Sequence, residues 1–415
     1  MTRWESYKVL FQEAFLHDQQ LCRLMQALGG SADQVRVVGG AVRNALRGLA
    51  VSDLDLACVH QPNEVMKRAA AAGFKTVPTG IAHGTVTVVG NGTKYEVTTL
   101  REDIETDGRR AIVRFGTDWQ RDMERRDFTM NALSVDREGV LHDLVAGLDD
   151  CLHGRVRFIG TARQRIAEDA LRILRFFRFS AHFGEGMPDA DGLAAAQGNL
   201  QLLDKLSVER IQREIKKLLS APRPEQLSTV MKAASAVLAQ LHLGVEGADF
   251  TALAKCDRVD WSLRAVVLWK QRTDRLVQTV RDLKFSKAEI GRIETLSAAV
   301  KFLDQRDLDD AFQIRLAAYH FGPDVADEAA YLASRSVANS DKQYEAWTKP
   351  LKDWQVPVFP VKAADLKQHG LKPGPEMGRC LKALERIWIE GQFGPSRDSL
   401  LEKMTLSLKK ESHDG

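Results

Sequence analysis

Hydrophobic positions along the chain follow two different patterns. Between about residues 35 and 145, short runs of hydrophobic and β-branched residues occur between turns, for example at residues 35–38, 54–59 and 84–89. Runs of about 4 to 8 such residues, bounded by glycine or asparagine, are typical of strands. After about residue 160, hydrophobic residues recur at every third or fourth position, which indicates amphipathic helices.

The first part of the chain is expected to form a small sheet with helices. Residues 84–89 and 94–100 flank a Gly90-Asn91-Gly92 turn, so they are expected to pair as a β-hairpin. Residues 62–73 have helical spacing and end in a glycine, which is a common helix stop. Strands that alternate with a helix predict an α/β unit on a small mixed sheet.

The second part is expected to be helical throughout. Residues 161–164 (TARQ) fit an N-terminal capping box, from which one long helix is expected to run to residue 183. Periodic hydrophobic residues predict further helices at 207–219, 226–243, 286–303 and 308–320. A last segment at residues 363–391 contains a Gly/Pro-rich stretch at 370–375 ahead of a final helix. The prediction is therefore an α/β head at residues 1–150 and an elongated all-α remainder with segments at residues 151–200, 201–345 and 346–415.

Length and composition are those of an ordinary globular protein with more than one core. A chain of 415 residues exceeds what one hydrophobic core usually serves. No hydrophobic run approaches the roughly 20 residues that span a bilayer, so no membrane partner is expected. Five scattered cysteines without CxxC spacing favour reduced thiols, and with no secretory signal at the N-terminus they predict a cytoplasmic protein.

Charge is more informative in its distribution than in its total. The net charge of +3 is nearly neutral and indicates no particular partner. Between residues 155 and 178, however, there are seven arginines and no lysine, with only Glu168 and Asp169 as acids. Arginine presents a planar fork of donors that suits phosphates and base edges, so this segment favours nucleotide recognition over a solvated helix face.

A glycine turn and three carboxylates are the first candidates for chemistry. Gly39-Gly40 lies between a predicted strand and helix, where backbone N–H groups can approach a phosphate, although a structural turn would explain it as well. Asp53 and Asp55 are two residues apart on a predicted strand, so both side chains point to one face and favour a hard cation such as Mg²⁺. Glu96, on a later strand, adds a third carboxylate, as in sites that hold two metal ions roughly 4 Å apart.

Residues 125–133 suit the phosphate and sugar of a nucleotide. Arg125 and Arg126 can face a triphosphate because guanidinium groups bind phosphates bidentately. Asp127 and Asn131 suit a ribose hydroxyl. A helix start capped by Asp127, with Arg126 in a salt bridge, would account for the same residues.

An acid and an arginine on the long helix expected at residues 161–183 suit a nucleobase. Asp169 and Arg172 stand three residues apart and are therefore expected to be neighbours, with Arg165 on the same side. An acceptor beside a donor fork matches the exocyclic amine and ring nitrogen that cytosine and adenine share and that uracil and guanine lack. The pair is a candidate for selecting C and A, the alternative being an intrahelical salt bridge.

The order of these motifs resembles the class II branch of the tRNA nucleotidyltransferase/poly(A) polymerase family, most closely its bacterial CCA-adding members. The matching segments are residues 38–44 (VGGAVRN), 52–56 (SDLDL), 95–101 (YEVTTLR), 107–110 (DGRR), 125–133 (RRDFTMNAL) and 168–175 (EDALRILR), with a further match at 365–378. One departure is Asn44, which stands where the family usually has Asp. Asparagine keeps a capping oxygen but lacks a charge that could orient Arg43.

The resemblance implies a fold and roles for individual residues. The fold is a nucleotidyltransferase head followed by a helical neck, body and tail, with residues 101–114 as a mobile loop beside the site. Asp53 and Asp55 would bind Mg²⁺, with Glu96 as the third catalytic carboxylate. The residues implied to bind ATP or CTP are Gly40, Arg43, Arg126, Asp169, Arg172, Arg175 and Arg178.

The expected activity is addition of CCA to the 3′ end of tRNA from CTP and ATP, without a nucleic-acid template. The body and tail are expected to bind the tRNA. Close alternatives are a poly(A) polymerase or an enzyme that adds only CC or only A. The lack of a sustained basic run at residues 409–415 favours CCA addition over poly(A) synthesis. A non-catalytic RNA-binding relative would be expected to lack some of the three carboxylates.

Overall fold

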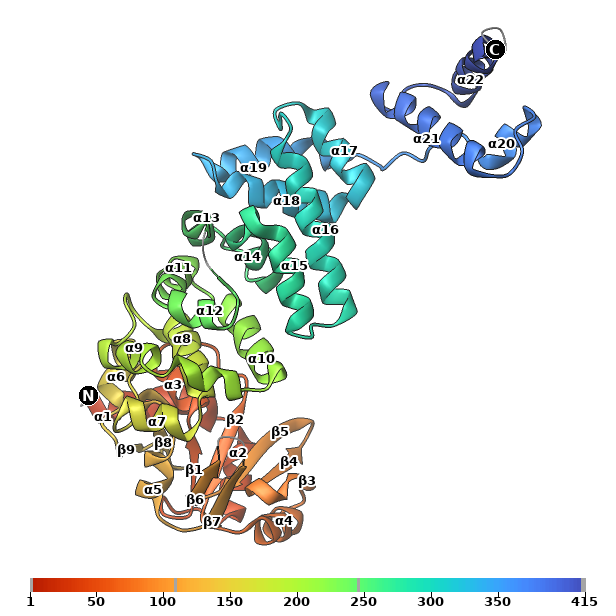
Figure 1. The fold of residues 1–415 in the computed structure, drawn as a ribbon. Helices are drawn as coiled ribbons and strands as arrows, with labels where there is room; N and C mark the ends of the chain where they lie inside the picture. Colours follow the sequence, from red (N-terminus) through yellow and green to blue (C-terminus); the bar gives the residue numbers. More distant parts are fainter. Residues whose placement is uncertain (1–2, 108–109, 245–246, 412–415) are drawn as a thin grey trace. The chain divides into compact units, whose positions relative to one another are not determined.

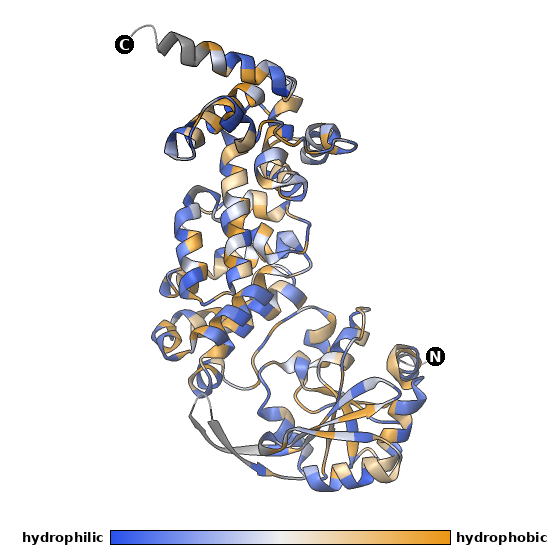
Figure 2. Cartoon of the chain, turned by 90° about the vertical axis from the view of Figure 1, so that its right-hand side faces the viewer, coloured by the Kyte–Doolittle hydropathy of each residue, from blue (hydrophilic) through white to orange (hydrophobic). Residues whose placement is uncertain are grey.

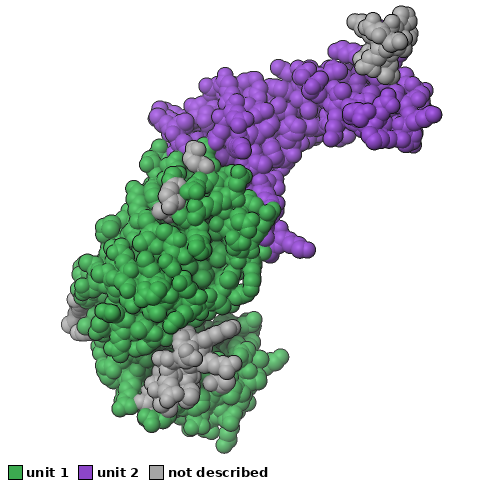
Figure 3. All heavy atoms as spheres, viewed as in Figure 1, with its two compact units in different colours: residues 1–285 green, residues 286–415 purple. Residues whose placement is uncertain are grey.

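The structure is a computed structural model that describes residues 3–107, 110–244 and 247–411. It divides into two compact units, Met1–Phe285 and Ser286–Gly415, which Figure 3 shows in different colours. The finer division into head, neck, body and tail at residues 150, 200 and 345 stays a prediction. None of the described helices is both long and apolar enough to cross a membrane.

A mixed sheet of seven strands forms the base of the first unit in the described part of the chain (Figure 1). Its strand order is β3-β4-β5-β2-β1-β8-β9, and every neighbouring pair is antiparallel except β2 and β5, which run parallel. The predicted mixed sheet is therefore confirmed. The strands are β1 (Val35–Val38), β2 (Leu54–Cys58), β3 (Lys75–Gly80), β4 (Thr85–Gly90), β5 (Thr93–Thr99), β8 (Leu133–Val135) and β9 (Leu141–Asp143).

The predicted hairpin forms between β4 and β5. Gly90 pairs with Thr93, so Asn91 and Gly92 make a two-residue turn. Both turn residues have positive φ, 49° for Asn91 and 85° for Gly92. Asparagine and glycine tolerate this left-handed backbone, which matches the twist of paired strands and explains why the sequence signal was reliable.

A second hairpin replaces the loop expected at residues 101–114. Strand β6 (Arg101–Asp107) pairs antiparallel with β7 (Arg110–Phe115) as a separate two-stranded sheet. Residues 108–109, which belong to the DGRR motif, lie outside the described residues. Charged residues dominate β6, so the hydrophobic pattern did not indicate a strand there.

Helices cover the sheet of the first unit and position its glycine turn. Helix α3 packs on β1, β2 and β8, and α4 packs on β3, β4 and β5. As a result, the residues that begin α3 lie at the end of β1, next to the centre of the sheet. The helical elements of this region are α1 (Arg3–Phe11), η1 (Gln12–Leu16), α2 (Gln19–Ala27), α3 (Gly40–Leu46), α4 (Pro62–Ala71), η2 (Ile81–His83), α5 (Trp119–Glu124), η3 (Thr129–Asn131) and α6 (Leu148–Leu152).

The long helix expected at residues 161–183 is interrupted. It consists of α7 (Ala162–Glu168) and α8 (Leu171–Phe183), and the side chain of Thr161 makes no capping hydrogen bond. Asp169 between them has extended backbone angles, φ −151° and ψ 107°. Its carboxylate accepts the backbone N–H of Leu171 at 3.0 Å, so Asp169 ends one helix and caps the next.

The rest of the first unit is helical, and no strand occurs after residue 160 among the residues that the structure describes. Helix α10 packs on both α8 and α14. The single helix expected at residues 226–243 is two helices, because Ala234 has ψ near 2° and ends the first of them. The elements are α9 (Ala190–Gln197), η4 (Leu200–Lys205), α10 (Val208–Leu219), α11 (Pro224–Ala233), α12 (Ser235–Gln240), α13 (Phe250–Ala254), α14 (Trp261–Leu268), η5 (Lys270–Arg272) and α15 (Thr273–Asp282).

The second unit is helical in its described residues, as predicted. Hydrophobic and hydrophilic residues alternate along its helices (Figure 2), consistent with one apolar face on each. Ser286 and Glu289 form a complete capping box at the start of the first helix. The elements are α16 (Lys287–Asp304), α17 (Ala311–Phe321), α18 (Pro323–Arg335), α19 (Ser340–Thr348), η6 (Lys349–Leu351), α20 (Ala363–Gln368), α21 (Pro375–Glu390) and α22 (Arg397–Glu411).

All five cysteines lie in the described part of the chain and are free thiols. This agrees with the prediction of reduced cysteines. The cytoplasmic location stays a prediction.

Candidate active site

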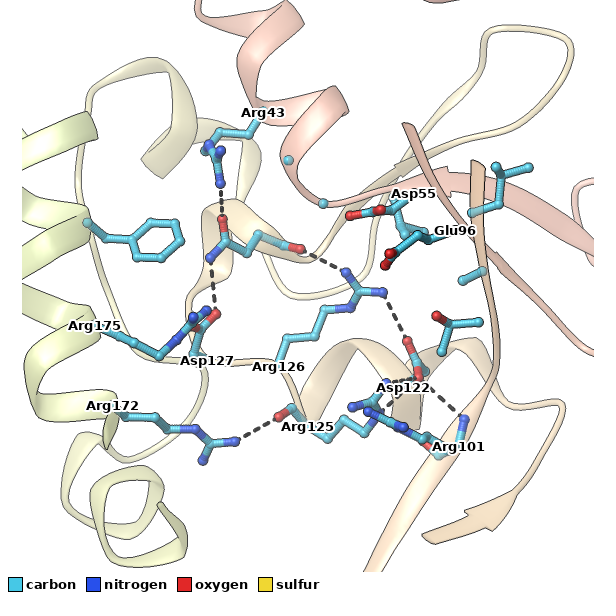
Figure 4. A pocket seen from close by; sticks show the side chains of 18 of the residues that line it. Arg43, Asp55, Glu96, Arg101, Asp122, Arg125, Arg126, Asp127, Arg172 and Arg175 are labelled. Carbon is cyan, nitrogen blue, oxygen red and sulfur yellow. Dashed lines mark hydrogen bonds and ion pairs between the residues drawn. The ribbon is translucent and has the colours of Figure 1, made fainter. Parts of the chain in front are cut away.

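A pocket of about 600 Å³ lies in the first unit, between the sheet, the segment after α5, and α8 (Figure 4). It contains six arginines and five acidic side chains, but no lysine or histidine. This composition suits a multiply charged anion together with a cation. The lining residues are Val38, Gly39, Gly40, Arg43, Asp55, Leu56, Ala57, Glu96, Thr98, Arg101, Asp122, Arg125, Arg126, Asp127, Asn131, Asp169, Arg172, Arg175 and Phe179.

The glycine turn lets an arginine approach the backbone closely. Gly39 has φ 67° and ψ −114°, a conformation that L-residues with a side chain avoid. A Cβ at this position would lie 3.2 Å from Nη1 of Arg126. Gly39 is therefore required both by its own backbone and by its neighbour, and Gly40 begins α3 at the pocket wall.

Two of the three predicted carboxylates meet in the pocket. Asp55 on β2 and Glu96 on β5 are direct partners in the parallel pair, so their side chains share one face of the sheet. Burial, Glu96 and Asp53, in that order of importance, raise the pKa of Asp55 above its usual value. Asp53 precedes β2, is exposed, accepts a hydrogen bond from Ser52 at 3.0 Å, and does not line the pocket.

The acidic face of the pocket fits a hard divalent cation. Among the described residues, no group of three or more His, Cys, Asp or Glu side chains is arranged as a ready metal site. Mg²⁺, however, is commonly bound through one or two carboxylates together with substrate phosphates. Burial is the main cause of the raised pKa of Asp55, and the repulsion from Glu96 and Asp53 that adds to it is the kind that a bound cation relieves.

Asp122, which sequence reasoning missed, holds two of the pocket arginines. Its carboxylate is 1% exposed and accepts from Arg125 at 2.7 Å and from Arg126 at 3.2 Å. Burial by itself would raise the pKa of Asp122, but the charges of Arg125 and Arg126 outweigh it and hold the pKa below its usual value. The available signal was the spacing of the three residues. Asp122 lies on α5, three residues before Arg125, which is the C-cap of that helix, and four residues before Arg126.

Asn131 connects Arg43, Arg126 and Asp127 within the pocket. Its Oδ1 accepts from Nη1 of Arg43 at 2.6 Å, and its Nδ2 donates to Asp127 at 3.0 Å. Its backbone oxygen accepts from Arg126 at 3.2 Å. The predicted ribose contacts of Asp127 and Asn131 stay untested, and in this structure both side chains already hold other pocket residues.

Buried Asp127 forms an ion pair with Arg175 on α8, whose side chain is partly exposed. The Nε of Arg175 donates to Oδ2 of Asp127 at 2.7 Å, and its Nη2 contacts the same oxygen. The pKa of Asp127, which burial alone would raise, is lowered by Arg175 and by hydrogen bonds from Asn131 and Phe128. This pair connects the segment after α5 directly to α8.

The expected pairing of Asp169 with Arg172 does not occur. Both line the pocket, but the break between α7 and α8 separates them, so the i, i+3 helical geometry does not apply. Asp169 instead accepts two hydrogen bonds from Arg210 on α10, at 2.7 and 3.0 Å. Arg172 donates to Glu168 at 2.5 Å, and Arg165 donates to the same oxygen at 2.8 Å.

Arg178 is the other predicted residue outside the pocket lining. Its Nε donates to Glu214 on α10 at 2.6 Å, and its guanidinium carbon lies 4.5 Å from the centre of the Phe179 ring. Arg210 and Glu214 are one helical turn apart, so α10 holds both Asp169 and Arg178 from one face. Nothing in the sequence paired these residues, because the partners are separated by 41 and 36 positions and by two or three other elements.

Comparison with known proteins places the chain among enzymes that act on tRNA ends. Residues 35–157 match the family described as Poly A polymerase head domain, and residues 260–404 match tRNA nucleotidyltransferase domain 2, putative. The chain is 32% identical over 404 residues to the mitochondrial CCA tRNA nucleotidyltransferase 1 of Mus musculus, which covers 94% of this chain and 90% of that protein. It is 30% identical over 404 residues to the CCA-adding enzyme of Levilactobacillus brevis, covering 92% and 96% respectively.

Solved structures agree with these sequence relatives. The structure of the Bacillus stearothermophilus CCA-adding enzyme in complex with CTP superimposes with a TM-score of 0.76 at 26% identity, covering 94% of this chain and 98% of that one. A Thermotoga maritima CCA-adding enzyme complexed with tRNA shares the fold, with a TM-score of 0.65 at 19% identity. With curated relatives at 30% identity or more over most of their length, this chain belongs to the family of CCA-adding tRNA nucleotidyltransferases.

Proposed function

We propose that this chain adds CCA to the 3′ end of tRNA, using CTP and ATP and releasing pyrophosphate. The observation that carries the proposal is one pocket in which sheet carboxylates face six arginines. The curated relatives, which cover about nine tenths of the chain and are named as CCA-adding, support the same product.

In the proposed reaction, the 3′-hydroxyl oxygen of the RNA attacks the α-phosphorus of the nucleotide. A new P–O bond to the RNA forms, the bond to the β-phosphate oxygen breaks, pyrophosphate leaves with the electron pair, and the proton of the hydroxyl is released to solvent. Mg²⁺, which Asp53 and Asp55 would hold with Glu96 beside them, would supply positive charge at the reacting phosphate and lower the pKa of the attacking hydroxyl. Arg43 and Arg126 would bind the triphosphate and hold it in place.

Selection of C and A would be made by the side chains at the break between α7 and α8. Asp169 offers an acceptor and Arg172 a donor fork, which suit the amine and ring nitrogen common to cytosine and adenine. In this structure Arg210 and Glu168 hold these two side chains. The extended backbone at Asp169 places both residues on the pocket wall, and this supports a shared role there.

The activity can be tested with purified protein and three RNA substrates. They are tRNA lacking CCA, tRNA ending in the first C, and an unstructured oligonucleotide, each offered CTP and ATP. We expect CCA on the first, CA on the second, and no extension of the third. Long A tracts on the oligonucleotide with no C added to tRNA would instead identify a poly(A) polymerase, and incorporation that stops at CC or requires CC would identify a partial enzyme.

The proposed site is tested in the same assay by Asp55→Asn and Glu138→Gln. Asp55→Asn removes one carboxylate charge from the pocket, and we expect the rate to fall by at least 100-fold, in line with the loss of one electrostatic stabiliser. Glu138→Gln, an exposed acid outside the pocket, is the control and should leave the rate unchanged. Full activity in Asp55→Asn would contradict the assigned site.

A further inference from the structure

Asn44 makes hydrogen bonds in two directions from the edge of the pocket. Its Oδ1 accepts from the guanidinium of Arg43, at 2.9 Å from Nη2 and 3.2 Å from Nε. Its Nδ2 donates to the backbone oxygen of Ala50 at 3.1 Å. A guanidinium only donates and a carbonyl only accepts, so the orientation of this amide is determined by its two partners.

We infer that Asn44 is a positioning residue that couples Arg43 to residues 47–53, the loop that leads into β2 and its carboxylates. The inference rests on the proposed function, because it assigns to Arg43 the phosphates of the bound nucleotide. Asparagine suits both tasks, since its amide supplies an acceptor and a donor on one side chain.

The direct contacts of the Arg43 guanidinium are with neutral groups, while the charges of Arg178, Asp127 and Arg175 act on it from further away. Besides Asn44, Asn131 accepts from it at 2.6 Å, and the ring of Phe183 lies 3.9 Å from its guanidinium carbon. Within the described part of the chain it has no carboxylate partner within 4 Å. Burial lowers the pKa of Arg43 to about 10, so the side chain stays charged near neutrality. The hydrogen bonds of Arg43 thus orient its charge without a directly paired carboxylate, which leaves the guanidinium able to bind an anionic ligand.

Arg47 at the start of the loop binds the backbone oxygen of Cys151 and the carboxylate of Glu185, but beyond Arg47 the loop has little packing of its own and depends on Asn44. Leu49 and Ala50 are exposed, and Gly48 adopts φ 65°. The backbone oxygen of Asn44 accepts the N–H of Leu49 at 2.8 Å, and its side chain binds the oxygen of Ala50. These hydrogen bonds connect the end of α3 to the segment that carries Asp53. A substitution of Asn44 should therefore alter both the orientation of Arg43 and the stability of the loop.

Two substitutions separate these tasks. Asn44→Asp retains an acceptor for Arg43 but cannot donate to Ala50, whereas Asn44→Ala removes both contacts. We would measure the affinity of the full chain for CTP and, by competition, for cytidine, together with hydrogen exchange of residues 47–53. Cytidine lacks phosphates, so it reports whether the base end of the site is intact. Neither measurement requires tRNA or turnover.

Asn44→Ala should weaken CTP binding about tenfold, because two hydrogen bonds to a charged group are lost, and should leave cytidine binding unchanged. Asn44→Asp should bind CTP within about threefold of the unmodified chain. In both variants hydrogen exchange in the loop should accelerate about fivefold or more, since the bond to Ala50 is absent. Asn199→Asp is the matched control, because Asn199 also donates to a backbone oxygen, at 2.7 Å, but lies outside the pocket. Asn199→Asp should change neither the affinity for CTP nor hydrogen exchange in the loop.

Three results would overturn the inference. They are unchanged CTP affinity in Asn44→Ala, an equal loss of CTP affinity in Asn44→Asp, and unchanged loop exchange in either variant. Failure of the proposed function would give a different result. The chain would bind CTP, and the Asn44 variants would behave as expected, but the chain would not extend tRNA.

Discussion

The buried carboxylate of Asp122 offers a direct test of how the pocket arginines are held. We consider Asp122→Asn, which keeps the shape of the side chain and removes its charge. In the structure this carboxylate accepts from Arg125 at 2.7 and 2.9 Å and from Arg126 at 3.2 Å. The substitution leaves two guanidinium groups without their counter-ion and places an amide donor against them.

The expected loss of stability follows from the burial of these groups. Removing one partner of a fully buried ion pair costs about 3 to 5 kcal/mol. Asp122 is almost completely buried, but the side chains of both arginines are 19% exposed, so water screens part of the loss. We therefore expect the free energy of unfolding of this unit to fall by about 2 to 3 kcal/mol near neutral pH.

The effect should depend on pH with a definite sign. The pKa of Asp122 is lower in the folded state than the usual value near 4, so its contribution to stability is fully present above that value. It is lost as pH falls through the folded-state pKa. The difference between the unmodified chain and Asp122→Asn should be constant from neutrality to about pH 5 and should shrink below about pH 4.

Hydrogen exchange of the peptide covering residues 119–131 measures this local stability without requiring the whole chain to unfold in one step. The control is Glu124→Gln on the same helix, an exposed acid whose replacement should cost no more than about 0.5 kcal/mol. Equal exchange in Asp122→Asn and the unmodified chain at pH 7 would refute the ion-pair argument. A difference that persists unchanged at pH 3.5 would show that it does not arise from the charge.

Three further outcomes are expected. Gly39→Ala should lower the melting temperature and weaken CTP binding, because it strains the backbone by about 1 to 3 kcal/mol and displaces Arg126; unchanged CTP affinity would contradict this. Arg210→Met should reduce CTP affinity several-fold in calorimetry by releasing Asp169, while pyrophosphate affinity should not change; an equal loss for both ligands would argue against base recognition. Chelation of divalent cations should stop nucleotide addition, and added Mg²⁺ should restore it; continued addition in chelator would exclude the metal assignment.

Local sequence patterns were enough to predict β1, β2, β4 and β5, which are four of the nine strands in the described residues. The β4–β5 hairpin was predictable because Asn91 and Gly92 are among the few residues that adopt left-handed turn conformations without strain. Alternation along one strand predicted that Asp53 and Asp55 share a face, but Asp53 precedes β2, and the pairing of Asp55 with Glu96 depends on the register between β2 and β5. Where the physical cause acts over a few residues, as in the hairpin turn, it is visible in the sequence.

The prediction of one continuous helix at residues 161–183 was wrong because the physical cause of the break lies far away in the sequence. Periodicity there is continuous, but the structure breaks the helix at Asp169, whose carboxylate caps α8 and binds Arg210 on α10. These bonds offset the helical hydrogen bonds that the break removes. A partner some 40 residues away decided this local conformation, and no helical propensity scale contains that information.

The sequence by itself therefore determined the class of fold, the carboxylate face and the family to which the chain belongs. Only the tertiary structure decided which arginine is held by which acid. Asp122, Asp127 and Asn131 join the pocket arginines through contacts that reach from the head to α8, and these depend on how the sheet and helices pack. Ion pairs among several arginines and acids have many equivalent pairings in sequence, and packing selects one of them because it brings Asp122 and Asp127 within hydrogen-bond reach of particular arginines.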